Sequence, residues 1–185
     1  MNRLDDNLRE AKQVDTLIDA FEQAFFPRYN TRLVRGDDEP VYLPANDVCA
    51  FHKIVFAHGF FASALHELAH WCIAGKARRL QEDYGYWYCP DGRDEQAQRM
   101  FEKVEVKPQA LEKAFSIACQ RAFQVSTDNL HGAEPDRAAF TQAVDRQYYH
   151  YCEKGFPARA AQLINVLAQT FGGEDAAAQA QKQVA

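Results

Sequence analysis

Three residues near the middle of the chain, His66, Glu67 and His70, could act together on a metal ion. They form an H-E-x-x-H motif within the largely apolar segment Phe60–Gly75. Histidines four residues apart lie on the same face of a helix, one turn apart, so both imidazoles can bind one ion. Single buried histidines usually bond to the backbone, but two at this spacing with a glutamate between them favour a metal site.

The helix that carries the motif is expected over about Phe60–Ala74, with Gly75 ending it. Its sequence is apolar on almost every side, which places it at the centre of the core. On a helical wheel the large apolar side chains lie opposite the two histidines. Small residues flank the histidines and predict an open space beside the imidazoles: Ala62, Ser63, Ala69 and Ala74.

Two imidazoles do not complete a metal site, which usually has a third protein ligand. One class of metalloproteases extends the motif with a glycine and a third histidine. Here Ile73 and Lys76 stand at those two positions, so that class is excluded.

A carboxylate is the better candidate for the third ligand. A helix is expected over Asp94–Val104, and three glutamates lie on it or directly after it: Glu95, Glu102 and Glu105. Glu105 follows the apolar Phe101 by one turn and so lies near the buried face, whereas Glu95 and Glu102 point largely away from it. The predicted metal ligands are therefore His66, His70 and Glu105.

The role of Glu67 stays open at this point. In a zinc peptidase this glutamate is the general base that activates the metal-bound water. It could also bond to a ligand or position a substrate. Two histidines and one carboxylate hold zinc in peptidases and Fe(II) in oxygenases, so the donor set does not choose the reaction.

The remaining pattern predicts a single α+β domain over residues 1–172, mostly helical, with a small sheet, a central H-E-x-x-H helix and a zincin-like metal site. Short strands are expected at Thr31–Arg35, Val41–Leu43, Lys53–Ala57 and Tyr84–Cys89. Further helices are expected over Asp5–Phe26, Pro108–Phe123, Pro135–Glu153 and Pro157–Phe171. The Ala- and Gln-rich tail, residues 173–185, is expected to be disordered.

Composition excludes several classes of protein. The net charge of −5 provides no basic field for nucleic acid. No segment is long and apolar enough to cross a bilayer, and Met1–Glu10 is too polar for a signal peptide. The five cysteines are odd in number and scattered, without a C-x-x-C pair. A reducing, cytoplasmic location with free thiols is expected.

Three segments together resemble the bacterial elongation factor P hydroxylases: HGFFASALHELAHWCIAG at His58–Gly75, DYGYWY at Asp83–Tyr88 and FEKVEVKPQAL at Phe101–Leu111. The resemblance covers nearly the whole chain except the tail and is far more specific than H-E-x-x-H alone. It implies a non-heme metal centre, with Fe(II) held by His66, His70 and Glu105. No departure from the family pattern occurs at these three positions.

The resemblance also implies the reaction and the partner. The enzyme would use molecular oxygen to hydroxylate a lysine of translation elongation factor P that already carries β-lysine. Two other interpretations remain at this stage. One is a zinc metallopeptidase with Glu67 as general base, and the other is a non-catalytic, metal-stabilised module that binds a translation factor.

Overall fold

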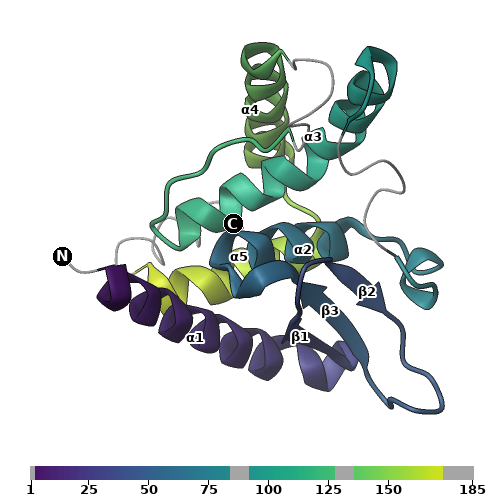
Figure 1. The fold of residues 1–185 in the computed structure, drawn as a ribbon, viewed down its shortest axis with the longest axis vertical. Coiled ribbons are helices and arrows are strands. Elements are labelled where there is room, and N and C mark those ends of the chain that lie inside the picture. The colour runs from purple at the N-terminus through teal and green to yellow at the C-terminus, as the bar shows by residue number, and fades with distance from the viewer. Residues whose placement is uncertain (1–2, 84–91, 128–135, 173–185) are drawn as a thin grey trace.

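The computed structural model describes residues 3–83, 92–127 and 136–172, which form five α-helices and, at one side of the molecule, a small three-stranded sheet (Figure 1). The helices are α1 (Arg3–Tyr29), α2 (Phe61–Ile73), α3 (Glu95–Ala118), α4 (Arg137–Lys154) and α5 (Ala158–Phe171). The strands are β1 (Thr31–Arg35), β2 (Val41–Leu43) and β3 (His52–Phe56). The prediction of a mostly helical α+β domain with a small sheet is confirmed. None of the described helices has the length and hydrophobicity needed to span a bilayer.

Helix α1 forms one wall of the core because its large apolar residues recur every three or four positions. Leu17, Phe21 and Phe25 are fully buried along one face. The predicted end before Pro27 is wrong, since the helix continues to Tyr29. A proline in the last turn removes only one backbone donor there. The helix ends instead where Asn30 adopts a positive φ and donates its N–H to the carbonyl of Phe26.

The sheet has the strand order β1-β3-β2, with β1 parallel and β2 antiparallel to the central β3. Strand β3 runs one residue earlier than expected, and its buried Ile54 and Phe56 belong to the main core cluster. Asp83 forms an isolated bridge with Tyr42 of β2. The strand predicted at Tyr84–Cys89 lies outside the described residues, as does the tail.

Helix α2 packs against α1, α3, α5 and β3, so the motif lies on a helix with neighbours on most sides (Figure 1). Trp71 is its main anchor, since its ring meets those of Phe25 and Tyr29 edge-on, each at 5.4 Å. Arg159 of α5 donates hydrogen bonds to carbonyls at the end of α2, and its guanidinium lies 4.8 Å from the Trp71 ring centre. The helix ends at Ile73, and Ala74, which follows it, has a non-helical backbone one residue before the predicted stop at Gly75.

Helix α3 differs most from the sequence-based expectation. Two helices separated before Pro108 were predicted, but a single helix runs from Glu95 to Ala118 with Pro108 inside it. Pro108 lacks the N–H that would reach the carbonyl of Val104, and it is buried. Because the helix is continuous, residues seven positions apart lie two turns apart on one face. Glu105 and Glu112 are such a pair.

An ion pair joins α1 to the segment after α3, beside the start of α2. Arg121, just after α3, donates to Glu10 Oε2 at 2.9 Å, and its guanidinium lies 4.0 Å from the Phe61 ring centre. The other Glu10 oxygen accepts the Phe61 N–H, the first of α2. The hydrogen bond from Arg121 lowers the pKa of Glu10, with help from the Phe61 N–H and against a smaller effect of burial.

This ion pair predicts a pH-dependent stability. Because the folded pKa of Glu10 lies below its unfolded value, the stabilisation is present above the unfolded pKa near 4.5 and disappears as the pH falls through the folded pKa. Glu10→Gln should therefore lower the melting temperature at pH 7 and cease to matter in strong acid. The pair is partly exposed, so the effect should be about 1 kcal/mol or less. Thermal melts of both proteins from pH 7 downward measure it.

The control is Glu39→Gln, which removes the same charge from an exposed position between β1 and β2. A loss that is equal at every pH would contradict the assignment to Glu10 ionisation.

Candidate metal centre

His66 and His70 of α2 face Glu105 of α3, and their potential ligand atoms all lie within 4.8 Å of one another. The two Nε2 atoms are 3.1 Å apart. His70 Nε2 lies 3.2 Å from Glu105 Oε1, and His66 Nε2 lies 3.6 Å from Glu105 Oε2. The structure thus brings together the three residues that the sequence singled out, although that they bind a metal stays a prediction.

The environment of Glu105 fits a bound cation. The residue is only 2% exposed, and its Oε2 is buried without a hydrogen-bond partner among the described residues. Burial alone would raise the pKa of Glu105, but the neighbouring charges of His70 and His66 outweigh it and lower the pKa to about 2. An ionised, buried carboxylate with one unsatisfied oxygen costs several kcal/mol unless a cation compensates it.

Glu112 is a functional candidate that the sequence reasoning missed. Its Oε2 lies 2.8 Å from His66 Nδ1, the ring nitrogen that faces away from Glu105. Burial would lower the pKa of His66, but the hydrogen bond and charge of Glu112, with the charges of Glu105 and Glu67, raise it well above its usual value. A carboxylate on Nδ1 fixes the ring and its tautomer so that Nε2 is directed to a metal.

The spacing that could have identified Glu112 was present in the sequence. Glu112 follows Glu105 by two helical turns, and the two residues share a helix face only if α3 is continuous. The predicted break before Pro108 separated the two glutamates. Of the other two candidates, Glu95 pairs with Arg99 at the surface, and Glu102 accepts a hydrogen bond from Gln98.

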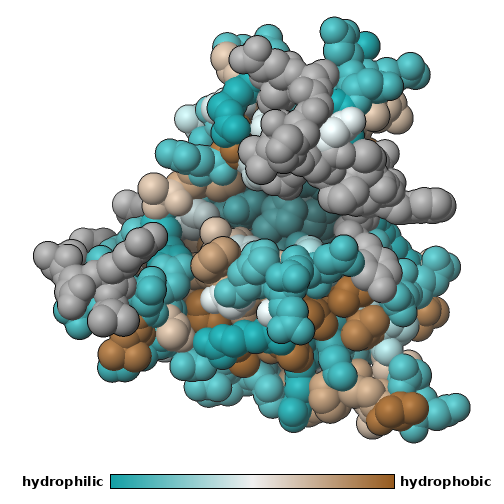
Figure 2. Space-filling model, viewed as in Figure 1, coloured by the Kyte–Doolittle hydropathy of each residue, from teal (hydrophilic) through white to brown (hydrophobic). Residues whose placement is uncertain are grey.

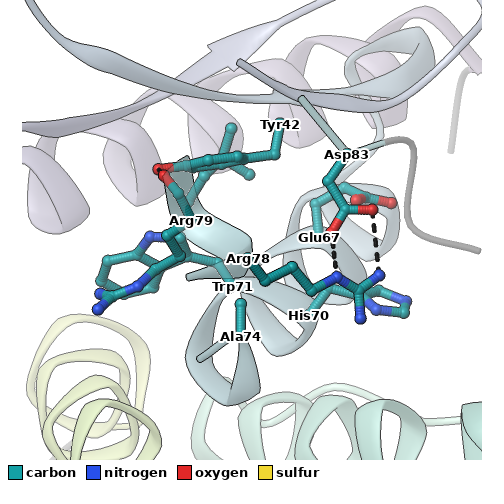
Figure 3. A pocket seen from close by; sticks show the side chains of 9 residues that line it. Tyr42, Glu67, His70, Trp71, Ala74, Arg78, Arg79 and Asp83 are labelled. Atoms are coloured by element: carbon teal, nitrogen blue, oxygen red, sulfur yellow. Dashed lines mark hydrogen bonds and ion pairs between the residues drawn. The ribbon is translucent and has the colours of Figure 1, made fainter. Parts of the chain in front are cut away.

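A pocket opens beside His70, on the side of α2 that faces the sheet (Figure 3). Its lining comes from α2, from β2 and β3 and from the segment after α2: Tyr42, Ile54, Glu67, His70, Trp71, Ala74, Arg78, Arg79 and Asp83. Arg78 donates hydrogen bonds to both carboxylate oxygens of Asp83. Burial raises the pKa of Glu67, against the opposing charges of His66 and His70.

This pocket corrects the expected position of the open space. Ala74 lines it, as predicted. Ala69, however, is fully buried in the main core cluster, and the Ser63 hydroxyl accepts the N–H of Ala57. The helical-wheel prediction of open space was wrong for Ala69 and Ser63. It failed because α5 and η1 (Ala57–Gly59) also pack against α2 and occupy part of its surface.

The surface is hollowed where α2 faces α3. Figure 2 shows hydrophilic side chains at the back of this hollow, between two bulkier parts of the molecule. The side chains of His66 and His70 are 22% and 18% exposed, so the centre is shielded but not sealed. Such partial exposure leaves a path for a small reactant or a substrate side chain.

Two histidines one turn apart on one helix, with a buried glutamate on the next, define a mostly helical protein with a possible two-histidine, one-carboxylate metal centre. The model of one family, described as Elongation factor P hydroxylase, matches residues 20–182. The chain belongs to this family. A relative from Haemophilus influenzae named Elongation factor P lysine hydroxylase is 53% identical over 163 residues, which are 88% of this chain and 92% of the relative.

The ligand assignment predicts the effect of three substitutions on metal content. His66→Ala, His70→Ala and Glu105→Ala should each lose bound metal, because two remaining ligands hold a divalent ion poorly. Glu102→Ala, three residues from Glu105 on the same helix, should retain it. Elemental analysis of the purified proteins measures the content. Full metal occupancy in Glu105→Ala would rule out Glu105 as a ligand.

The Glu112 contact predicts a smaller, graded loss. Glu112→Gln keeps the side-chain volume but removes the charge that orients His66, so metal affinity should fall roughly 10- to 100-fold. Competition with a chromophoric chelator measures the change. Glu95→Gln, at the exposed start of α3, is the matched control. Equal affinities for the wild type and Glu112→Gln would show that this contact does not tune the site.

Proposed function

We propose that this protein hydroxylates a lysine side chain of translation elongation factor P at a metal centre formed by His66, His70 and Glu105. The family match over residues 20–182 carries the reaction and the substrate. The name of the Haemophilus influenzae relative supports lysine as the target residue. The cluster of three ligand-type residues supports a metal at the place where the family motif lies.

The metal that fits this proposal is Fe(II). Two imidazoles and one carboxylate leave coordination positions open, and iron bound in this way supplies the activation of molecular oxygen. Within the protein, Glu112 orients His66, and the buried Glu105 provides negative charge. The pocket beside His70 would hold the substrate side chain.

Finer features of the substrate and location rest on the family resemblance. The target lysine would already carry a β-lysyl group when it is hydroxylated. Because elongation factor P acts in translation, the reaction would take place in the cytoplasm. The zincin-like character of the H-E-x-x-H helix and a domain spanning residues 1–172 belong to the same proposal.

A zinc metallopeptidase would use the same three ligands, with Glu67 as general base. A metal-stabilised binding module would need no reaction. The family match favours the hydroxylase over both.

The decisive experiment reconstitutes metal-stripped protein with Fe(II) or Zn(II) and incubates it with elongation factor P. In air and with an added two-electron reductant such as ascorbate, the Fe(II) protein should add the mass of one oxygen atom to elongation factor P, detected by intact-mass spectrometry, while the second oxygen atom leaves as water. Zn(II) should support no change, and removal of oxygen should stop the reaction. His70→Ala, treated with Fe(II), is the control for reaction in solution.

The other results identify the alternatives. Cleavage of elongation factor P by the zinc protein without oxygen would establish the peptidase. An unchanged mass together with binding would establish the binding module.

A further inference from the structure

Two hydrogen-bond donors at the pocket beside His70 have no acceptor. Trp71 Nε1 and Arg79 Nε are both buried, and neither has a hydrogen-bond partner among the described residues. Both side chains line the pocket, and Figure 3 draws them at the end opposite Glu67 and Asp83. A buried donor without an acceptor destabilises the free protein, so this end of the pocket suits a ligand that brings an oxygen atom.

The same end of the pocket carries positive charge that no carboxylate neutralises. The guanidinium of Arg159 lies 4.8 Å from the Trp71 ring centre and donates its hydrogen bonds to backbone carbonyls at the end of α2. Burial and the charge of Arg79 lower the pKa of Arg159. Neither arginine has a carboxylate within ion-pair distance among the residues that the structure describes. An ammonium group is therefore repelled from this end, whereas the oxygen of a neutral carbonyl is attracted to it.

The opposite end of the pocket carries carboxylates. Glu67 and Asp83 lie there, while Ile54 and Trp71 contribute apolar lining. A side chain that carries a carbonyl and, further along, an ammonium group would therefore bind in one direction. Its carbonyl would lie toward Arg79, and its ammonium group would turn away from that end.

β-Lysylation changes a lysine in the way that this pocket distinguishes. The side chain of an unmodified lysine ends in a cation. After β-lysylation the same nitrogen is a neutral amide, bonded to a carbonyl whose oxygen accepts hydrogen bonds. The ammonium groups of the added β-lysyl group are separated from this carbonyl by carbon atoms. The modified side chain thus offers an acceptor to Trp71 and Arg79 and leaves its ammonium groups free to turn toward Glu67.

We propose that Trp71 and Arg79 form a carbonyl-binding subsite that accepts the amide oxygen of the β-lysylated lysine and disfavours the unmodified lysine. This inference rests on the proposed function for the identity of the substrate. Arg79 is half-buried, so a small rotation of its long side chain opens both donors to the oxygen. Attraction of the carbonyl and repulsion of the ammonium together give a physical reason why β-lysylation precedes hydroxylation.

The test measures binding without the reaction. Protein loaded with Zn(II) is titrated calorimetrically with three forms of elongation factor P, in which the target lysine is β-lysylated, acetylated or unmodified. The acetylated form keeps the amide carbonyl and has no ammonium group on that side chain. The wild type should bind both acylated forms roughly tenfold more tightly than the unmodified form, since a hydrogen bond from a charged donor has about that value.

Arg79→Met keeps an unbranched apolar side chain and removes the donor and the charge. It should lose most of the preference for the acylated forms, because the attraction and the repulsion both weaken. Its zinc content should equal that of the wild type, since Arg79 is not a proposed ligand. The control is Lys76→Met, which removes an exposed cation of the same segment that does not line the pocket and should discriminate like the wild type.

Three results would overturn the inference. Arg79→Met could keep the wild-type preference, or it could weaken all three forms equally, as a merely structural role would. The acetylated form could also bind the wild type no better than the unmodified form, which would assign recognition to the ammonium groups of the β-lysyl group.

Two further arrangements keep the test decisive. If Arg79→Met does not fold, Arg79→Lys takes its place, since it keeps the charge but lacks the Nε donor and should reduce the preference in part. Absence of oxygen transfer by the Fe(II) protein would refute the proposed function alone, because the zinc titration does not depend on the reaction.

Discussion

The buried charge of Glu105 is the interaction on which the arrangement of α2 and α3 depends. A carboxylate that is 2% exposed is stable only beside compensating groups, and the imidazoles of His66 and His70 are the ones that lie next to it. One oxygen of Glu105 still remains without a hydrogen bond among the described residues. The two helices therefore hold these side chains as a divalent cation between them would require. Without a cation, the buried charge lowers the stability of the fold, and the apolar core must offset that loss.

The continuity of α3 places a second carboxylate, Glu112, against His66. With the helix unbroken at Pro108, Glu105 faces the Nε2 side of the histidines, and Glu112, two turns further, reaches His66 Nδ1. One continuous helix thus positions both the proposed ligand Glu105 and Glu112, which orients the proposed ligand His66. The cost of the missing Pro108 donor is confined to a single backbone carbonyl, whereas a break would have freed the two carboxylates to move independently.

The sequence predicted the elements that are determined by local apolar spacing and turn residues. It failed to predict the features that depend on tertiary packing. The motif helix, β1 and β2 were predicted almost to the residue, because apolar spacing and turn residues bound them. The grouping of His66, His70 and Glu105 followed from one helical wheel on each helix. Pro27 was read as a helix end and Pro108 as the start of a new helix, yet a helix tolerates a proline when tertiary contacts hold both sides. The open space was predicted too broadly, because a wheel cannot show that α5 and η1 occupy part of the surface of α2.

The H-E-x-x-H motif specifies where a metal can be held, and the residues around it decide the chemistry. In a peptidase the glutamate of the motif must act on a metal-bound water. Here Glu67 lines a pocket with apolar walls and one compensated ion pair, beside a centre whose third proposed ligand is a carboxylate. A motif glutamate in this position contacts whatever fills the pocket beside the metal centre, so the motif by itself does not make the protein a peptidase.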